Sequence, residues 1–490
     1  MKKNLLLFAG IVLTAGMLSA CGSGGQTAET AEESSTVVQE ENSATASAED
    51  GTDAGEVTTV TYWNTDSGEK AFVDEIVEEF NSTIGKENNV QIELTHVESS
   101  SATQELGVAL QNGVGPDIFD IGAGLLSEYV EKGYVFPLTD LTGLEELVEK
   151  NSGRSDGNNT WQNKMYAIQV SQGVIGLAYN KDMFVEAGIV DENGEAKPPE
   201  TIAEMVEDAK ILTDVSAQKF GFAFPLGWSG AIVDYYISYP SQSVSGLLKG
   251  MYDYRTGLYD FSGVKAYSDA YLQMKENGSL YPGAESLDND AARARFAEGN
   301  IGMMMTVYWD CAVWNDQFPA KCDWGVAPIP LASEDEAYYQ WTSLRNSYSI
   351  GTRGIEEGRG DAIAMVFNYL YSDEMMIRRA ESGIAIPCRE DIVEKCNFSE
   401  SPKGWDDYCQ LVKVSINNSY SSKSVDLDGL DNYSTEWVNN VWTGEKSVDD
   451  WIAEMTERYN TGVEFYMENA PEDIAAIMNA RMDPDLDLSR

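Results

Sequence analysis

The sequence has 490 residues, of which 81 are acidic and 33 basic, so its formal net charge at pH 7 is −48. This charge excludes nucleic-acid binding, which relies on lysine and arginine to neutralise phosphates, and it disfavours anionic ligands. The chain is too long for a single hydrophobic core and long enough for two lobes.

The first twenty residues predict an export signal. Lys2 and Lys3 precede an apolar stretch over residues 5–18, which is shorter than the roughly 20 residues of a bilayer-spanning helix. The stretch ends in Leu18-Ser19-Ala20-Cys21. This run resembles the lipobox of bacterial lipoproteins, in which the cysteine is acylated and becomes the new N-terminus. We expect a signal peptide over residues 1–20 and a lipid on Cys21, and an ordinary signal peptide with an incidental cysteine is the alternative.

Residues 21–56 predict a flexible tether. After Cys21 the segment carries nine acidic residues, no basic ones and no aromatic ones. Such a composition buries too little apolar surface to offset the entropy of ordering, so we expect a disordered, extended stalk.

The next residues alternate between strand and helix patterns. Strands are predicted over residues 57–63, 90–97 and 117–121. Helices are predicted from Ser67-Gly68 onward, over residues 101–112, and after Gly122-Ala123-Gly124 up to Gly133. Strand-helix alternation is typical of a parallel sheet covered on both faces, which is an α/β fold.

A second unit follows from about residue 166. Two extended runs, residues 166–170 and 174–179, flank Ser171-Gln172-Gly173, and Thr201 with Glu204 forms a capping box for a helix. Further on we predict a helix over residues 291–298, an apolar strand over 301–307, a crossover at 324–330, and a late helix capped by Ser447.

Cysteine and histidine usage makes a metal site improbable. Five cysteines remain besides Cys21, an odd number without Cys-x-x-Cys spacing, and His96 is the only histidine. A Cys311–Cys322 disulfide and free thiols are both compatible with the sequence. We expect a structural role for His96, no metal and no cofactor.

Several runs together resemble the sugar-binding proteins of ABC importers, in the maltose-binding-protein-like group, family 1. They are GPDIF at 115–119, KMYAI at 164–168, AYNKDMF at 178–184, PET at 199–201, FAEGNIGMM at 296–304 and WGVAPIP at 324–330. The order and spacing of these runs match the group from residue 56 to the C-terminus.

The resemblance implies a two-lobed, periplasmic-binding-protein-like fold of type II with a multi-strand hinge and a ligand cleft between the lobes. Carried over, lobe one would comprise residues 57–168 plus 329–382, and lobe two residues 169–328 plus 383–490. The hinge strands would lie near residues 166–172, 325–330 and 383–387.

A sugar offers apolar C–H faces to aromatic rings and hydroxyls to polar side chains, so we look for both in loops beyond the carboxyl ends of strands. Asn64 and Asp66 follow the first strand, although Asp66 could merely cap the next helix and the adjacent Trp63 could be core. Gly122-Ala123-Gly124 offers only backbone contacts or space. Gln172 is a hydroxyl partner at the hinge, or part of a polar turn.

The remaining candidates are mainly aromatic. Trp228 lies in a loop beside a glycine, which favours stacking on a ligand, and the Tyr308-Trp309-Asp310 run combines stacking planes with a carboxylate. Trp341 and Arg345 could line the cleft, or could serve core packing and a surface ion pair. The tyrosines of residues 235–239 receive no role.

The sequence therefore predicts a lipid-anchored receptor on the outer face of the cytoplasmic membrane. It would bind a neutral mono- or oligosaccharide and deliver it to the permease subunits of an ABC transporter, without catalysis, and we expect a monomer. The alternatives are a surface-anchored polysaccharide-degrading enzyme, such as a two-carboxylate glycosidase, and a carbohydrate sensor or adhesin that uses the same cleft.

Overall fold

The structure, a computed structural model, describes residues 56–121, 125–152, 159–162, 164–228, 231–333, 337–416, 425, 427, 429–470 and 487–490. The predictions for Cys21, for the tether up to residue 55 and for Gly122-Ala123-Gly124 lie outside these residues. No helix in the described ranges is long and apolar enough to cross a bilayer.

A mixed sheet of ten strands organises the described part of the chain. Seven strands follow the order β2-β1-β3-β13-β7-β11-β8, and β4, β12 and β14 pair at its sides. The strands are β1 Thr58–Asn64, β2 Val90–His96, β3 Ile118–Asp120, β4 Val135–Phe136, β7 Ala167–Asn180, β8 Phe220–Phe222, β11 Ile301–Val307, β12 Trp324–Ala327, β13 Gln340–Gly351 and β14 Ser415–Ile416. Two short hairpins add β5 Thr160–Trp161 with β6 Lys164–Met165, and β9 Tyr252–Asp253 with β10 Leu258–Tyr259.

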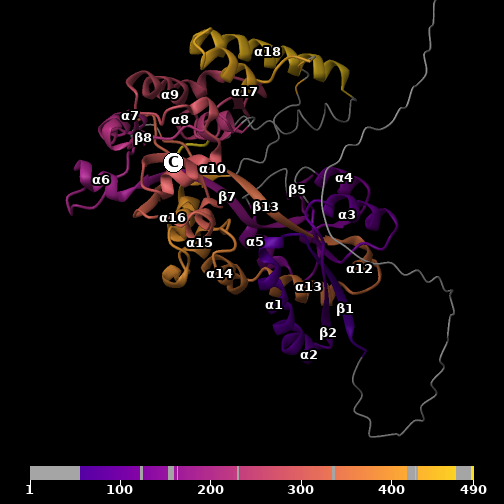
Figure 1. Ribbon diagram of the computed structural model, residues 1–490. Helices are drawn as coiled ribbons and strands as arrows, with labels where there is room; N and C mark the ends of the chain where they lie inside the picture. Colours follow the sequence, from indigo (N-terminus) through magenta and orange to yellow (C-terminus); the bar gives the residue numbers. More distant parts are fainter. Residues whose placement is uncertain are drawn as a thin grey trace, which may run out of the picture. The chain divides into compact units, whose positions relative to one another are not determined.

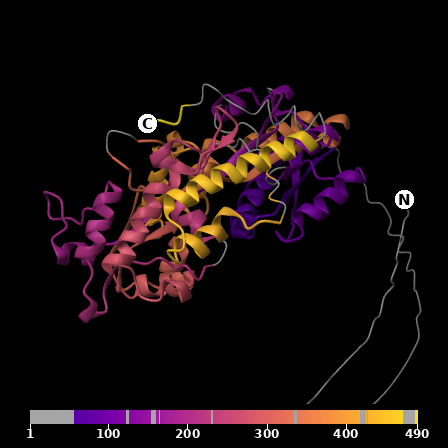
Figure 2. The same cartoon turned by 90° about the horizontal axis from the view of Figure 1, so that it is seen from above.

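Helices cover the sheet on both sides of β7 and β13 (Figure 1). They are α1 Lys70–Ser82, α2 Ile84–Asn88, α3 Ala102–Gln111, α4 Leu126–Glu131, α5 Glu145–Asn151, α6 Lys181–Ala187, α7 Ile202–Ile211, α8 Gln242–Ser245, α9 Lys265–Asn277, α10 Asn289–Ala297, α11 Asp310–Ala312, α12 Thr352–Glu356, α13 Gly360–Leu370, α14 Asp373–Glu381, α15 Glu390–Val393, α16 Trp405–Gln410, α17 Tyr433–Glu436 and α18 Val448–Asn469. The long helix α18, yellow in Figure 2, buries Trp451 and Met455 in the same core as α7 and α9.

Most elements confirm the sequence predictions. The parallel pairs β1–β2 and β1–β3, followed by α1 and α3, build the predicted α/β unit. The capping box of Thr201 and Glu204 is present at the start of α7, and Ser447 caps α18. All seven residues of β11 are buried, as expected for a methionine-rich core strand.

The buried side chains form two groups of cores. We call the first lobe the part built around the cores that contain Val60, Phe72, Ile118, Phe119 and Phe367. We call the second lobe the part built around the cores that contain Phe184, Phe224, Tyr271, Phe296 and Trp324.

The strand β7 corrects the prediction of two runs separated by a polar turn. Ser171-Gln172-Gly173 continues the strand, because these residues pair with Arg345, Leu344 and Ser343 of β13. Ile168 and Val170 pack in the first lobe, whereas Val174 and Ile175 pack in the second. One uninterrupted strand therefore connects the lobes.

The second connection is β13 and not the predicted run 325–330. In β13, Trp341 packs against the second lobe and Tyr348 and Ile350 pack in the first. Trp324 and Val326 of β12 and the following Ile329 all belong to cores of the second lobe, because β12 pairs with the far end of β7. The chain thus returns to the first lobe through β13 and not at residue 329.

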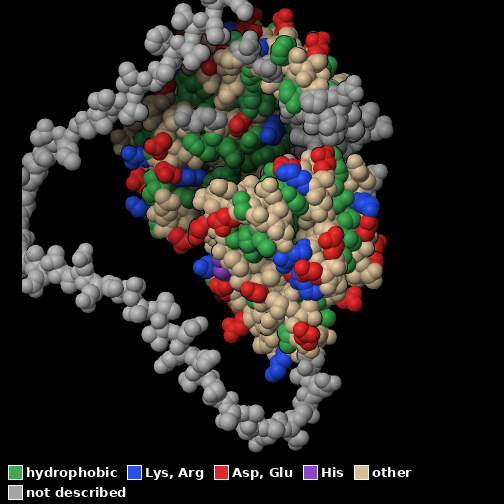
Figure 3. All heavy atoms as spheres, turned by 90° about the vertical axis from the view of Figure 1, so that its right-hand side faces the viewer, with side chains coloured by type: hydrophobic (Ala, Val, Ile, Leu, Met, Phe, Trp, Pro, Cys, Tyr) green, Lys and Arg blue, Asp and Glu red, His purple; other side chains and the backbone are tan. Residues whose placement is uncertain are grey.

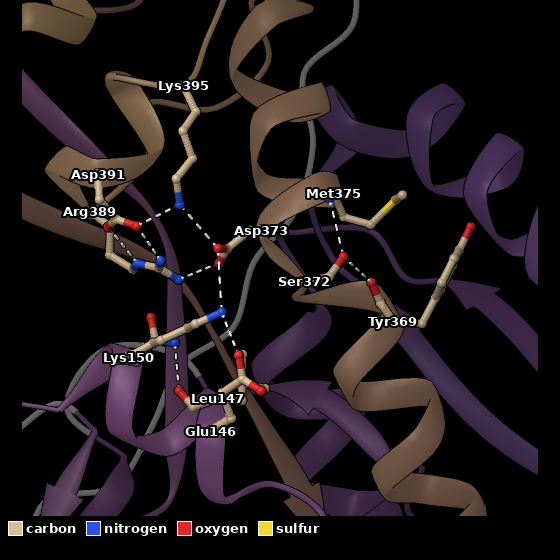
Figure 4. A network of polar contacts seen from close by, with 11 residues as sticks. Glu146, Leu147, Lys150, Tyr369, Ser372, Asp373, Met375, Arg389, Asp391 and Lys395 are labelled. Atoms are coloured by element: carbon tan, nitrogen blue, oxygen red, sulfur yellow. Dashed lines mark hydrogen bonds and ion pairs between the residues drawn. The ribbon is translucent and has the colours of Figure 1, made fainter.

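A third connection follows α14, where the side chains alternate between the lobes. Ile384 packs against the first lobe, Ile386 packs in the second, and Ile392 again packs in the first. Arg389 fixes this segment, because its guanidinium donates to Asp373 at 2.8 Å and to Asp391 at 2.5 and 2.9 Å (Figure 4). Lys150 of α5 and Lys395 also contact Asp373, so the network joins α5, α14 and α15.

This network predicts a pH-dependent contribution to stability. Hydrogen bonds from Arg389 are the main reason that the pKa of Asp391 falls to about 2. A carboxyl with a lowered pKa stabilises the folded state above its unfolded pKa and loses that effect as the pH falls towards the folded value. We expect Asp391→Asn to lower the free energy of unfolding by about 1 kcal/mol at pH 7, since the side chain is half exposed.

Urea unfolding at pH 7, 4 and 3 measures this effect. The difference between Asp391→Asn and the wild type should be largest at pH 7 and shrink below pH 4. Glu394→Gln, an exposed neighbour just after α15, is the matched control. A difference that is constant with pH would contradict the assignment.

Of the five cysteines in the described residues, Cys311, Cys322, Cys396 and Cys409 are free thiols. Cys311, Cys322, Cys388 and Cys409 are buried and Cys396 is half-buried. Burial raises the pKa of Cys311 to about 12 and the pKa values of Cys322 and Cys396 to about 11. Their roles are those of small apolar side chains, and Cys311 and Cys322 are not joined.

Candidate ligand-binding site

Six half-buried aromatic rings form a continuous group at the edge of the second lobe. Neighbouring rings stack or meet edge to face, with centroids 4.0 to 6.1 Å apart. We call this group the aromatic wall; it consists of Trp228, Tyr235, Tyr239, Tyr308, Trp309 and Trp341. Sequence reasoning selected four of the six and missed both Tyr235 and Tyr239.

A π-helical turn, η4 (Asp234–Ser238), contains the first missed tyrosine, Tyr235, and the second, Tyr239, follows the turn directly. Tyr235 stacks on Trp228 at 5.1 Å, and Tyr239 stacks on Trp341 at 4.0 Å. Tyr236, between them, is buried in the core of the second lobe. The four-residue spacing of Tyr235 and Tyr239 was the available signal, because side chains at i and i+4 lie on one face of a helix.

Lys249 adds a charge beside this wall. Its ammonium lies 5.2 Å from the ring centroid of Tyr239 and 5.7 Å from that of Trp341, within cation–π range. Burial lowers the pKa of Lys249, and Asp234 opposes that shift. The ammonium thus helps to hold the two rings in their stack.

Tyr308 and Trp309 follow β11 and meet edge to face at 5.3 Å. Burial raises the pKa of Tyr308, whereas the charge of Arg345 lowers it and that of Asp66 raises it. The guanidinium of Arg345 lies 5.6 Å from the ring centroid of Tyr308. Tyr308 therefore links the aromatic wall to charged groups of β13 and of the first lobe.

Gly173 of β7 makes room for Tyr308. A Cβ at this position would lie 3.2 Å from the ring of Tyr308 and 2.6 Å from the hydroxyl oxygen of Ser343. We expect Gly173→Ala to displace the ring and to weaken ligand binding by about tenfold, in line with an overpacking cost of 1–3 kcal/mol.

Calorimetric titration with the ligand measures this loss of affinity. The matched control is Gly107→Ala in α3, where an added Cβ meets nothing within 4 Å. That variant should bind normally and be slightly more stable than the wild type. Equal affinities of both variants would show that Tyr308 does not need this space.

A polar cavity of about 300 Å³ lies on the side of the first lobe. Its lining combines residues at and after the ends of β1, β2 and β3, residues of α3 and α4, and one residue of β13. The polar lining residues are Thr65, Asp66, Ser67, Ser99, Thr103, Asp120, Tyr129 and Arg345. Two of the predicted residues, Asp66 and Arg345, therefore lie in one cavity.

Asp66 caps the turn η1 (Ser67–Glu69) by accepting from the backbone N–H of Gly68 at 2.8 Å. This confirms its capping interpretation; Asp66 also lines the cavity, and its contact with a ligand stays a prediction. Asn64, in contrast, is only 1% exposed. Its side-chain amide contacts the backbone of Asp66, the ring of His96 and the hydroxyl of Tyr348. Asn64 positions the Asp66 loop, and His96 is its structural partner.

Two more predicted residues are buried. Gln172 is 4% exposed, and its side-chain amide donates to the carbonyl of Pro387 at 2.9 Å. Asp310 is 2% exposed and accepts from Arg293, from the hydroxyl of Thr306 and from the backbone of Val307. Burial raises the pKa of Asp310, and Arg293 opposes the shift.

These contacts give the buried residues a supporting geometry. Asp310 holds the turn that carries Tyr308 and Trp309, and Gln172 clamps β7 to the third connection. Trp63 packs against a core of the first lobe, as its alternative interpretation predicted.

On the face shown in Figure 3, hydrophobic side chains gather in a hollow that also contains acidic and basic ones. Aromatic planes on one side and hydroxyl-binding groups on the other suit a ligand with apolar faces and many hydroxyls.

A family profile described as "Bacterial extracellular solute-binding protein" matches residues 63–374. Among curated relatives, a maltotriose-binding protein of Pyrococcus abyssi is 23% identical over 248 residues, which are 51% of this chain and 49% of that protein. A binding protein of Brucella abortus is 24% identical over 247 residues, which are 50% of this chain and 55% of that protein. The chain spans about half the length of the curated relatives it matches.

Solved structures show the fold. The apo form of RafE from Streptococcus pneumoniae has a TM-score of 0.62 at 17% identity, covering 84% of this chain and 98% of RafE. The sugar-binding protein MalE from Xanthomonas citri has a TM-score of 0.62 at 16% identity, covering 84% and 100% of the two chains. A cyclo/maltodextrin-binding protein in complex with maltotetraose has a TM-score of 0.60 at 15% identity, covering 86% and 100%. The two-lobed type II fold agrees with the sequence prediction.

Proposed function

Because this chain belongs to the bacterial extracellular solute-binding proteins, we propose that it is the sugar-binding component of an ABC transporter. Its ligand is a neutral mono- or oligosaccharide held between the aromatic wall and the polar cavity. The single observation that carries this proposal is that rings and hydroxyl-binding groups come from different lobes but meet at Arg345 and Tyr308. Raffinose and maltotetraose, which occur in the structures of relatives, suggest the range of ligand sizes.

In this proposal Trp228, Tyr235, Tyr239, Trp309 and Trp341 cover the apolar faces of the sugar. Asp66 and Arg345 form charge-assisted hydrogen bonds with its hydroxyls. Asn64, Gln172 and Asp310 position these groups without touching the ligand.

Closure of the lobes completes the mechanism. The three connections, β7, β13 and the segment after α14, would act as the hinge. A ligand favours the closed form only by as much as it binds that form more tightly, so contacts to both lobes are required. The closed protein would then present both lobes to the permease.

We further propose that a lipid on Cys21 and the acidic tether hold the protein, as a monomer, at the outer face of the membrane. The export signal and the lipobox-like run support this anchor. A flexible, charged tether would let the folded part of the protein extend away from the membrane surface without an additional folded element.

A ligand panel tests the proposal. The purified protein is heated with raffinose, maltotriose, maltotetraose and monosaccharides, and binders are titrated by calorimetry. A true ligand at a hundred times its Kd should stabilise the protein by about 2.7 kcal/mol and be recovered intact. No response to any saccharide, with a response to another solute, would overturn the sugar assignment, and steady product formation would indicate an enzyme.

A further inference from the structure

A buried ion pair lies directly behind the loop of residues 65–67. Glu69 and Arg379 expose 2% and 1% of their side chains, and the Nε of Arg379 lies 3.4 Å from the Oε2 of Glu69. Arg379 also donates from Nη1 to the carbonyl of Leu370 at 2.8 Å, and its guanidinium lies 4.9 Å from the ring centroid of Phe72. The pair is thus held in one position from several sides.

On the side of the ligand, the pair is continuous with the polar cavity. Glu69 is the last residue of η1, the turn that Asp66 caps. Asp66 and Ser67 line the cavity, so a change in this loop moves the turn that carries Glu69. Only Ser67 and Gly68 separate Asp66, whose charge faces the cavity, from Glu69, whose charge is buried.

On the other side, Arg379 of α14 contacts the third connection, which follows that helix. Its backbone carbonyl accepts from the N–H groups of Ile384 and Ala385, at 3.1 and 3.4 Å. The next two carbonyls of that segment, those of Ile386 and Pro387, accept from the backbone and the side chain of Gln172. The loop, the ion pair, residues 383–387 and strand β7 therefore form one chain of contacts.

We propose that Glu69 and Arg379 are a positioning pair that couples the cavity loop of residues 65–67 to the 383–387 connection between the lobes. Movement of the loop on ligand contact shifts Glu69, Arg379 follows because its charge has no other acid to pair with as closely in the described residues, and the hinge segment responds. The inference rests on the proposed function, because coupling to a hinge has a purpose only in a receptor whose lobes close.

The energetics favour a specific role over simple stabilisation. A buried ion pair roughly breaks even against apolar side chains of the same volume, because desolvation offsets the attraction. In addition, the Nη2 of Arg379 is buried without a hydrogen-bond partner among the residues that the structure describes. Because the Glu69–Arg379 pair adds little net stability, its burial fits a role in fixing the relative positions of the two segments that it joins.

The test is a ligand-free double-mutant cycle read by hydrogen exchange. Asp66→Ala removes the cap of η1 and perturbs the loop. We expect it to speed amide exchange across residues 383–388 by about threefold or more, the range of coupling along packed networks. In the background Glu69→Gln/Arg379→Met, exchange there should already be faster, and Asp66→Ala should add nothing further.

A second buried pair of the same lobe is the matched control. Arg359 pairs with Asp117, which exposes 1% of its side chain, and the other side-chain partners of Arg359 in the described residues are Thr59 and Glu357, outside residues 383–387. In the background Asp117→Asn/Arg359→Met, the effect of Asp66→Ala should persist in full. If the variant Glu69→Gln/Arg379→Met does not fold, Arg379→Lys takes its place. This substitution keeps the positive charge but removes the planar guanidinium group.

Two outcomes would overturn the coupling. One is unchanged exchange at residues 383–388 in Asp66→Ala alone, and the other is an equal effect of Asp66→Ala with and without the pair. Since the cycle uses no sugar, its failure is distinguishable from a failure of the ligand panel.

Discussion

Trp309→Ala is expected to weaken sugar binding by about thirtyfold. Trp309 is half-buried and lies between Tyr235 and Tyr308, so its loss removes a plane from the middle of the aromatic wall. Covering about 80 Å² of ring by a sugar face contributes about 2 kcal/mol at 25 cal/mol/Å², and each 1.4 kcal/mol changes the Kd tenfold.

Calorimetry with the sugar that gives the largest thermal shift measures this change. Trp309→Phe should retain part of the affinity, because a smaller ring still covers part of the sugar. Tyr281→Ala is the control: this half-buried ring packs on Phe220 in the second lobe, and in the described residues it makes no ring contact with the aromatic wall. Loss of affinity in Tyr281→Ala equal to that in Trp309→Ala would argue against a stacking role.

Arg293→Met is expected to lower the free energy of unfolding of the second lobe by about 3–5 kcal/mol. The substitution leaves the carboxylate of Asp310 buried without its counter-ion, and an uncompensated buried charge has a cost in this range. Because Asp310 also holds the backbone of Val307, the turn bearing Tyr308 and Trp309 should shift and sugar affinity should fall as well.

Urea unfolding followed by tryptophan fluorescence measures the effect on stability. Arg295→Met is the matched control on the same helix, because Arg295 forms an exposed pair with Glu298 that contributes at most about 1 kcal/mol. Adding Asp310→Asn to Arg293→Met should restore part of the loss by removing the charge. Similar midpoints for Arg293→Met and Arg295→Met would show that the buried pair has no such role.

Periodicity predicted many elements of both lobes well, because hydrophobic spacing and terminal caps are local properties of the sequence. Residues 101–112, for example, became α3 (Ala102–Gln111), and residues 301–307 became β11. The connections between lobes were harder to predict. A glycine and two polar residues at 171–173 are typical of a turn, and only pairing with β13, far along the chain, keeps them in a strand.

The candidate site shows the same contrast between features set by local sequence and features set by distant partners. Loop position predicted Trp228, Trp309 and Asp66 next to a cavity or an aromatic group, and Trp341 and Arg345, also among the predicted residues, lie there on β13. It could not show that Asn64, Gln172 and Asp310 are buried, because burial of a polar side chain depends on partners distant in sequence, such as Tyr348, Pro387 and Arg293. It also passed over Tyr235 and Tyr239, whose rings reach the wall only through a π-helical turn.

The protonated, enclosed thiols have a practical consequence. The thiolate is the species that reacts with maleimides, and burial keeps Cys311, Cys322 and Cys409 in the thiol form. A cysteine introduced on an exposed edge of either lobe would therefore take up a fluorescent dye in preference to these three. With such a dye, this chain would become the starting point for an optical biosensor whose emission reports the dissolved solute that it binds.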